Sequence, residues 1–220
     1  MAKSVTFIDT EVGVDDHKIH DIGAIRQDRA SFHAANIREF AAFVEGTEYI
    51  CGHNILHHDL KYLQNALGYE LPAIKIDTLY LSPLLFPKRP YHALLKDDKL
   101  QSDQLNDPVN DCKKAATLFY DEVNAFFELP SKVKQIFCCL LYDHPEFHGF
   151  FRYVNFRPYH VNVPELIRAE YEGQICSNAE LLPLIRHYPV ELAYALALVG
   201  AKDEHSITPC LLYTSDAVDD

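Results

Sequence analysis

The alternation of apolar and polar positions predicts an α/β arrangement in the first part of the chain. Apolar and β-branched runs at Ser4–Asp9 and His20–Arg26 predict two strands, and Ala30–Ala34 is a weaker third. Two further short strands are expected at Glu48–Gly52 and Ala73–Asp77. Three early strands followed by alternating helices and strands indicate a mixed sheet flanked by helices.

Helical spacing of apolar residues separates these strands and follows them. The clearest helix is Asp107–Leu129, where Asp107 is expected to cap the N-terminus and Pro108 to occupy the first turn. The other helices predicted in this part are Asn36–Val44, Ile55–Leu67, which Gly68 ends, and Thr78–Leu85.

From Pro130 onward the pattern becomes helical throughout. Helices are expected at Ser131–Tyr142, Val163–Gly173, Asn178–Ile185 and Val190–Val199. The segment 144–160, HPEFHGFFRYVNFRPYH, is interpreted as Pro- and aromatic-rich turns. We therefore expect one domain over residues 1–129, and a helical appendage or the start of a further domain over residues 130–209.

The last residues, Cys210–Asp220, read CLLYTSDAVDD and resemble the peptide produced when a sequencing-library adapter is translated in frame. On this interpretation the tail is non-native, the natural sequence stops at about Pro209 and the reading frame is truncated. The alternative is an ordinary polar C-terminus. A second, independent clone of the gene distinguishes the two.

Composition places limits on location and partners. No apolar stretch has the length of a membrane span or a signal peptide, and six cysteines without a CxxC pair are typical of a reducing cytosol. A cytoplasmic protein without a membrane partner is predicted. The net charge of −12 argues against broad, charge-driven binding of nucleic acid. It leaves room for an enzyme acting on nucleic acid, because bound divalent cations bring positive charge locally.

Two acids end the first predicted strand on the same side. In VTFIDTE, side chains alternate, so Asp9 and Glu11 face the way that Val5 and Phe7 face. Two like charges about 7 Å apart at the end of a buried strand are costly unless something neutralises them. A divalent cation would do so. A solvated strand end with incidental acids is the alternative.

Two later aspartates lie on helices and are candidates for the same site. Asp59 sits at the border of an apolar stripe, from which it can reach a cleft; a surface aspartate near a helix N-terminus is the alternative. Asp111, one turn into its helix, shares a side with Ala115 and Leu118 and is expected to point inward.

The motifs FIDTE, GHN…HHDL and the late N-x4-D-x3-A helix, in this order, resemble the three exonuclease motifs of the DEDD (DnaQ-like) 3′–5′ exonucleases. The resemblance extends over about Ser4 to Phe127. It implies an RNase H-like mixed sheet flanked by helices, a nucleic acid 3′ end as partner with DNA favoured, and hydrolysis assisted by two Mg²⁺ or Mn²⁺ ions. The ligands it implies are Asp9, Glu11, Asp59 and Asp111.

The same resemblance assigns further roles and shows one departure. Thr10, His53 and Asn54 stand beside the ligands in sequence and are expected to help hold the terminal nucleotide. The family's general-base histidine precedes the last aspartate by five residues, where this chain has Asn106. Asparagine cannot accept a proton near neutral pH, so catalysis is expected to be slow or lost unless a residue such as His92 substitutes.

Two broader hypotheses remain open from the sequence. The segment 189–209 resembles the one that joins such exonuclease modules to RecQ-like helicases in some bacterial proteins, which implies DNA repair and a helicase domain missing here, since no GxxxxGK[ST] is present. The alternative is a catalytically weak or inactive module that binds nucleic acid or a protein.

An aromatic cluster with Arg152 and Arg157 would stack on bases or, alternatively, form core packing. Its members are Phe147, Phe150, Phe151, Tyr153, Phe156 and Tyr159.

Overall fold

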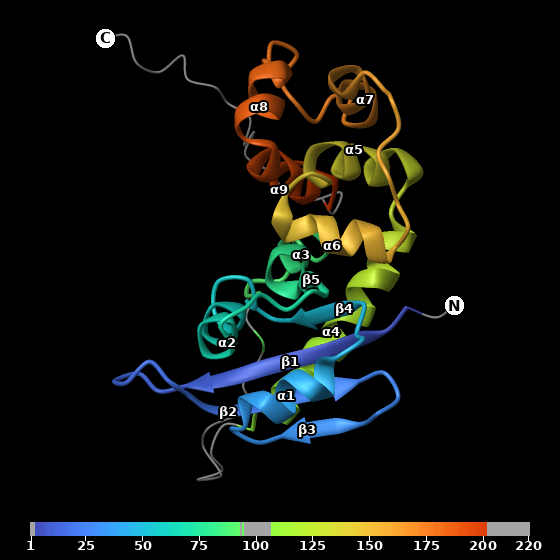
Figure 1. Ribbon diagram of the computed structural model, residues 1–220. Helices are drawn as coiled ribbons and strands as arrows, with labels where there is room; N and C mark the ends of the chain where they lie inside the picture. Colours follow the sequence, from blue (N-terminus) through green and yellow to red (C-terminus); the bar gives the residue numbers. More distant parts are fainter. Residues whose placement is uncertain (1–2, 93, 95–106, 202–220) are drawn as a thin grey trace.

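The computed structural model describes residues 3–92, 94 and 107–201, and in these residues a five-stranded mixed sheet carries helices on both faces (Figure 1). β1 is antiparallel to β2 and parallel to β4, while β3 and β5 form the two edges. The predicted mixed sheet flanked by helices is confirmed. The strands in spatial order are β3 (Ser31–His33), β2 (Ile19–Arg26), β1 (Val5–Val12), β4 (Tyr49–Gly52) and β5 (Ile74–Asp77).

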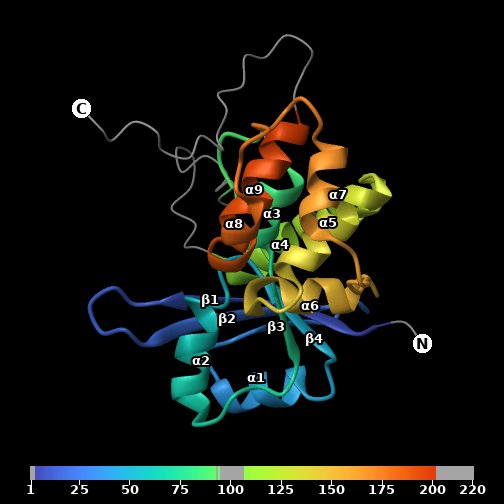
Figure 2. The ribbon, with the colours of Figure 1, turned by 90° about the horizontal axis from the view of Figure 1, so that it is seen from above.

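The helices divide unequally between the two faces of the sheet (Figure 2). One face is covered by α1 (Ile37–Val44) and α2 (Asp59–Leu67). On the other side lie α3 (Thr78–Leu85), α4 (Pro108–Glu128), α5 (Ser131–Leu141), α6 (Pro145–Tyr153), α7 (Val163–Glu170), α8 (Leu181–His187) and α9 (Pro189–Gly200). Among the described residues, none of these helices combines the length and the hydropathy that a membrane span requires.

Each face of the sheet has its own apolar core, and β1 contributes to both. Phe7 packs in the core beneath α4, and its neighbour Ile8 packs in the core beneath α1 and α2. The alternation predicted for β1 is therefore confirmed. The core beneath α4 runs without interruption from Val5 of β1 to Val199 of α9, so the helices after Glu128 pack as an extension of the sheet layer. The division into residues 1–129 and 130–209 stays a prediction.

One prediction in the second half of the chain is wrong. The segment 144–160, expected to form turns, contains the helix α6, which begins at Pro145. Pro145 fits the first turn of a helix, and Phe147, Phe150 and Phe151 then fall on one buried face. Gly149 lets this helix approach the backbone of Lys75 in β5, where a side chain would collide. Packing on β5 therefore decides the conformation.

The aromatic cluster predicted in this segment is mostly part of the core. Phe147, Phe150 and Phe151 are each at most 1% exposed, which leaves them no face for a base. Phe126 of α4 stacks edge-on against Phe150. Core packing, the second of the two alternatives, is confirmed for these three rings. Tyr159 stays exposed.

Candidate metal centre

The end of β1 and the first turn of α4 bring three carboxylates together. Asp9 and Glu11 project from β1, and Asp111 projects from α4. One carboxylate oxygen from each of the three lies within 4.8 Å of the other two. Like charges this close oppose one another unless a proton or a cation reduces the charge. These three residues could hold a metal ion.

A glycine on β2 explains how Asp111 reaches the strand. Gly23 pairs with Asp9 in the antiparallel ladder. A Cβ at Gly23 would lie 2.6 Å from the Pro108 carbonyl oxygen and 2.6 Å from the Val109 nitrogen. Only glycine therefore lets the start of α4 rest directly on β2, beside Asp9. An isolated glycine inside a strand is visible in the sequence and indicates a close backbone contact, but the sequence does not show that the contact is with the start of α4.

The start of α4 is itself held by a cap. The Asp107 carboxylate accepts a hydrogen bond from the Val109 amide at 2.9 Å, and Pro108 occupies the first turn. The predicted capping role of Asp107 is confirmed, so this acid belongs to the helix start and Asp111 to the cluster. Lys114 lies 3.3 Å from Asp111, between its Nζ and a carboxylate oxygen.

The surroundings of Asp9 favour its neutral form. Burial contributes most, followed by the negative charges of Asp59, Asp111 and Glu11, and together they raise the pKa of Asp9 to about 8. Near neutral pH and without a cation, this carboxyl therefore holds a proton. A divalent cation at the cluster would displace that proton and supply the missing positive charge.

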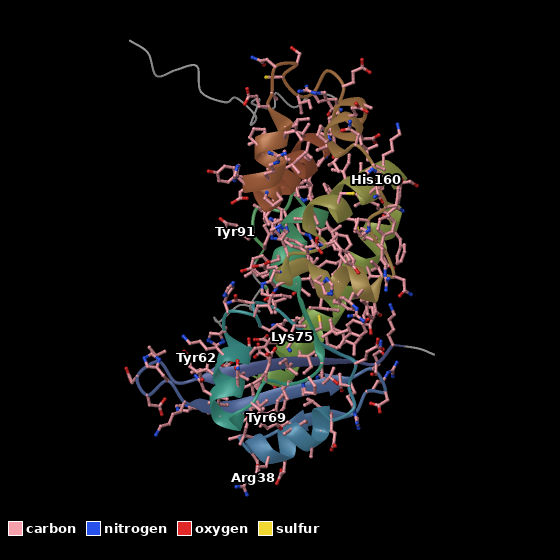
Figure 3. The ribbon with its side chains drawn as sticks, turned by 45° about the horizontal axis from the view of Figure 1, so that its top comes forward. Arg38, Tyr62, Tyr69, Lys75, Tyr91 and His160 are labelled. Carbon is pink, nitrogen blue, oxygen red and sulfur yellow. The ribbon has the colours of Figure 1, made fainter. Side chains whose placement is uncertain are left out.

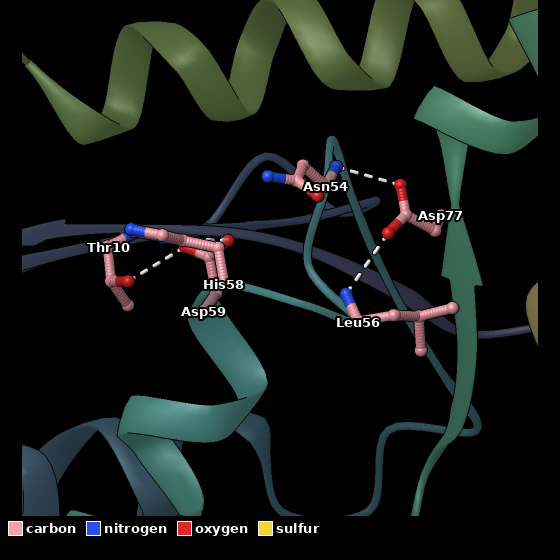
Figure 4. Close-up of polar contacts among 6 residues, drawn as sticks. All are labelled: Thr10, Asn54, Leu56, His58, Asp59 and Asp77. Carbon is pink, nitrogen blue, oxygen red and sulfur yellow. Dashed lines mark hydrogen bonds and ion pairs between the residues drawn. The ribbon is translucent and has the colours of Figure 1, made fainter.

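Asp59 lies beside the cluster and is hydrogen-bonded to Thr10 of β1 (Figure 4). Its Oδ1 accepts hydrogen bonds from the Thr10 amide at 2.6 Å and from the Thr10 hydroxyl at 2.7 Å. β4 pairs with β1 only as far as Phe7, so the Thr10 amide lies beyond the paired part and takes a side-chain acceptor instead. Asp59 is only 2% exposed. Its charge acts on Asp9, although it is not one of the three closest carboxylates.

His58, which precedes Asp59, lies on the same side of the site. Its Nδ1 lies 3.7 Å from Asp59 Oδ2, and the Asp59 carboxylate raises the pKa of His58. The sequence pattern did not single out His58 for this role. Sequence alone does not show whether a histidine next to a predicted acid points toward that acid, because neighbouring side chains can point in different directions.

A further buried acid, Asp77 at the end of β5, shapes the loop before α2. Asp77 is fully buried, and its Oδ1 accepts hydrogen bonds from the Leu79 amide at 3.0 Å and from the Asn54 amide at 2.7 Å, the second of which is drawn in Figure 4. Its Oδ2 accepts another from the Leu56 amide at 3.0 Å. The sequence indicated Asp77 only as the end of a strand. It is a structural acceptor for three backbone amides.

These bonds correct the predicted start of α2. A helix was expected from Ile55, but α2 begins at Asp59. The backbone amides of Asn54 and Leu56 donate to the Asp77 carboxylate and not to a helical carbonyl. Asn54 also adopts a left-handed φ of 65°, which a helix does not allow. Asp59 is thus the first residue of the helix. Gly68, with its left-handed φ of 77°, ends it as predicted.

His53 presents a lone pair beside these acids. The Thr78 hydroxyl donates to the Gly52 carbonyl at 3.2 Å, so it has no second proton and must accept from His53 Nδ1, 2.9 Å away. His53 Nε2 is then an unprotonated acceptor, buried and without a hydrogen-bond partner among the described residues. Burial lowers the pKa of His53 to about 4, against the opposing charge of Asp59. His53 is therefore neutral above that pH.

The two residues considered for proton transfer differ in what the structure describes. Asn106 lies outside the described residues. His92 is described: its Nδ1 lies 3.0 Å from the Ser82 hydroxyl, and burial lowers its pKa. A protonated His92 would lower the pKa of His53 further. Their part in proton transfer stays a prediction.

The site thus joins acids from β1 and α4, with Asp59 of α2 and His53 adjoining them. Comparisons of the chain with protein-family models, with curated proteins and with solved structures found no match. The function is therefore inferred from the geometry and chemistry of these residues.

Proposed function

We propose that this protein is a 3′–5′ exonuclease of the RNase H-like fold, which uses two divalent cations to release nucleotides from the 3′ end of nucleic acid, DNA by preference. The observation that carries the proposal is the convergence of Asp9, Glu11 and Asp111, with Asp59 adjoining them. These are the acids of the three sequence motifs, and they come from segments about 100 residues apart in a chain of 220. The strand order and the antiparallel β1–β2 pair also support it.

The donor set fits hard cations. Three carboxylates supply only oxygen, which Mg²⁺ and Mn²⁺ prefer, whereas a structural zinc site favours sulfur and nitrogen. Burial, and after it the negative charges of Asp59, Asp111 and Glu11, raises the pKa of Asp9, and a bound cation would oppose both effects. Asp9, Glu11 and Asp111 would hold the ions, with Asp59 at their edge. When bound, two such ions make an attacking water more acidic and stabilise the negative charge of the leaving oxygen.

The chain's own groups would orient the substrate around these carboxylates. Asp59 fixes Thr10 through two hydrogen bonds, and this holds the strand residues on either side of Thr10, Asp9 and Glu11, in place. The free lone pair on His53 Nε2 would accept a hydrogen bond from a hydroxyl of the terminal nucleotide or from the attacking water. Asn54 has its amide committed to Asp77, so only its side chain is available for the nucleotide.

The departure at Asn106 predicts a slow enzyme. A positioned general base contributes roughly 10²–10⁴-fold, and asparagine cannot provide it. With Asn106 in that position, the proton of the attacking water would pass to a weaker acceptor, such as neutral His53. Asn106→His is expected to raise the rate. A module that binds a 3′ end without cutting it is the second candidate, favoured by the same asparagine.

The wider setting follows the second resemblance and is part of the proposal. A segment like that of α9 and the residues after it joins exonuclease modules to RecQ-like helicases, so we propose a cytoplasmic role in DNA repair, linked to a helicase. Recovering the gene beyond Pro209 tests this, because a helicase domain would show a nucleotide-binding loop downstream.

The decisive test measures release of nucleotide from a single strand labelled at its 3′ end, with Mn²⁺ and with Mn²⁺ plus chelator. Asp9→Asn is expected to lower the rate at least about 100-fold, because it removes a charge that the cations require. Asp15→Asn, an exposed acid in the β1–β2 turn, is the matched control and should retain the rate. Equal rates for wild type and Asp9→Asn, or release that survives the chelator, would contradict the proposal.

A further inference from the structure

A groove of about 630 Å³ lies beside the carboxylate cluster. One wall comes from α4 and includes Lys113, Lys114 and Asp121; the other comes from the segment after α3 and includes Arg89 and Tyr91. Lys114 connects the groove to the cluster, because its Nζ lies 3.3 Å from Asp111 Oδ1. Lys114 therefore belongs both to the lining of the groove and to the surroundings of the cluster.

The charge of the groove is opposite to that of the whole chain. The protein carries a net charge of −12, yet Arg89, Lys113 and Lys114 face this groove with Asp121 as their single carboxylate among its described lining residues. His92 also lines it and is neutral near pH 7, because burial and then the charge of Arg89 lower its pKa. Cations concentrated in this way on an acidic protein favour an anionic ligand.

The side chains are placed for phosphates and for a base. Lys113 is exposed on α4, and its Nζ has only a 3.2 Å hydrogen bond to Asn110 Oδ1 among the contacts described for it. The Arg89 guanidinium lies over the Phe86 ring, with its Cζ 3.8 Å from the ring centroid, and this contact helps to hold the cation in position. Tyr91 is 79% exposed at the rim, between the sheet and the outer helices (Figure 3). An exposed aromatic ring beside cations is the arrangement that stacks a base next to its phosphate.

We propose that this groove binds single-stranded nucleic acid and leads its 3′ end to the carboxylates, with Arg89 and Lys113 on phosphates and Tyr91 on a base. The volume is that of a small-ligand pocket, which is enough for one or two nucleotides of a flexible strand. The direction of the strand rests on the proposed exonuclease function; binding itself does not.

The test measures binding without hydrolysis. A fluorescein-labelled single strand of 12 thymidines is titrated with the full chain in the presence of chelator, and fluorescence anisotropy gives Kd at several salt concentrations. Arg89→Glu and Lys113→Glu should each weaken binding about tenfold, and each should lower the slope of log Kd against log salt by about 0.7. Arg38→Glu is the matched control, since Arg38 is exposed on α1 at the opposite face of the sheet, and should change Kd less than about twofold (Figure 3).

Two further measurements make the result unambiguous. Arg89→Gln, which keeps a neutral side chain over Phe86, and thermal melting of every variant exclude simple unfolding. A blunt duplex of the same length should bind more weakly than the single strand. Equal losses for Arg38→Glu and Arg89→Glu, or tighter binding of the duplex, would overturn the groove. Strand binding through the groove with no Mn²⁺-dependent release would overturn the exonuclease and leave the groove standing.

Discussion

Two acids, Asp77 and Asp9, lie on opposite sides of β4, and their surroundings act on them differently. On the β5 side, Asp77 receives three backbone amides, which oppose the effect of burial on its pKa. On the β1 side, Asp9 faces Asp111 and other carboxylates, which add to the effect of burial and raise its pKa to about 8. The fold supplies hydrogen-bond donors to Asp77, whereas it places like charges around Asp9.

The difference teaches how to separate a structural acid from a site acid. Burial alone does not distinguish them, because Asp59 and Asp77 are more buried than Asp9. The hydrogen-bond donors do. A carboxylate whose oxygens accept backbone amides stabilises the fold, whereas a cluster without enough donors stores repulsion that a cation relieves. Asp59 lies between the two cases, since it holds Thr10 and also acts on Asp9.

Removing the structural acid should give the largest effect on stability. Asp77→Ala leaves three amides without their acceptor in a buried place, and the free energy of unfolding is expected to fall by about 3–5 kcal/mol. Urea denaturation followed by circular dichroism measures it. Asp16→Ala, at an exposed turn, is the control and should cost less than about 1 kcal/mol. A similar small loss for Asp77→Ala would show that the amides find other partners.

Moving Asp111 away from Asp9 should lower the free energy of unfolding less than Asp77→Ala does, but it should weaken the binding of a metal ion. Gly23→Ala forces α4 away from β2, which we expect to lower the free energy of unfolding by about 1–3 kcal/mol. Because Asp111 then moves from Asp9, the rise in Tm produced by Mn²⁺ should shrink. Gly46→Ala is the control: the left-handed φ of 75° at Gly46 strains a substituted side chain, but a Cβ there meets no atom within 4 Å. If Mn²⁺ raises the Tm of Gly23→Ala as much as that of the wild type, Asp111 does not contribute to binding the metal ion.

A third buried acid, Glu122 of α4, sharpens the comparison because it has neither donors nor a cluster. It is fully buried, and within the part of the chain that the structure describes neither carboxylate oxygen has a hydrogen-bond partner. Burial, and then the charge of Asp77, raises the pKa of Glu122 above its ordinary value of 4.5. The unfolded chain therefore ionises at lower pH than the folded one, and stability falls as the pH rises above about 4.5.

Glu122→Gln should remove this loss. The variant is expected to match the wild type in free energy of unfolding near pH 4. As the pH rises, the wild type loses stability and the variant does not, so the difference grows by at most about 1.4 kcal/mol per pH unit. Urea denaturation between pH 4 and pH 8 measures the difference. Glu128→Gln, at the exposed end of the same helix, should show no such trend. A constant difference across this range would mean that Glu122 ionises alike in both states.

The sequence by itself determined the local elements of this protein. Period-2 alternation placed Asp9 and Glu11 on one side of β1, and the Asp107–Pro108 pair marked the start of α4, because both signals act between neighbours along the chain. Gly68 ended α2 for the same reason. The candidate acids Asp9, Glu11 and Asp111 were also named from the sequence, on the motifs they belong to.

Tertiary structure decided whatever depends on a distant partner. Asp77 holds Asn54, 23 residues earlier, and so moves the start of α2; no pattern within either segment encodes that bond. The contact of Gly23 with the start of α4 and the burial of α6 on β5 are of the same kind. Local patterns report the preferences of one segment, whereas these contacts arise only when packing brings two segments within the range of a hydrogen bond or a van der Waals contact.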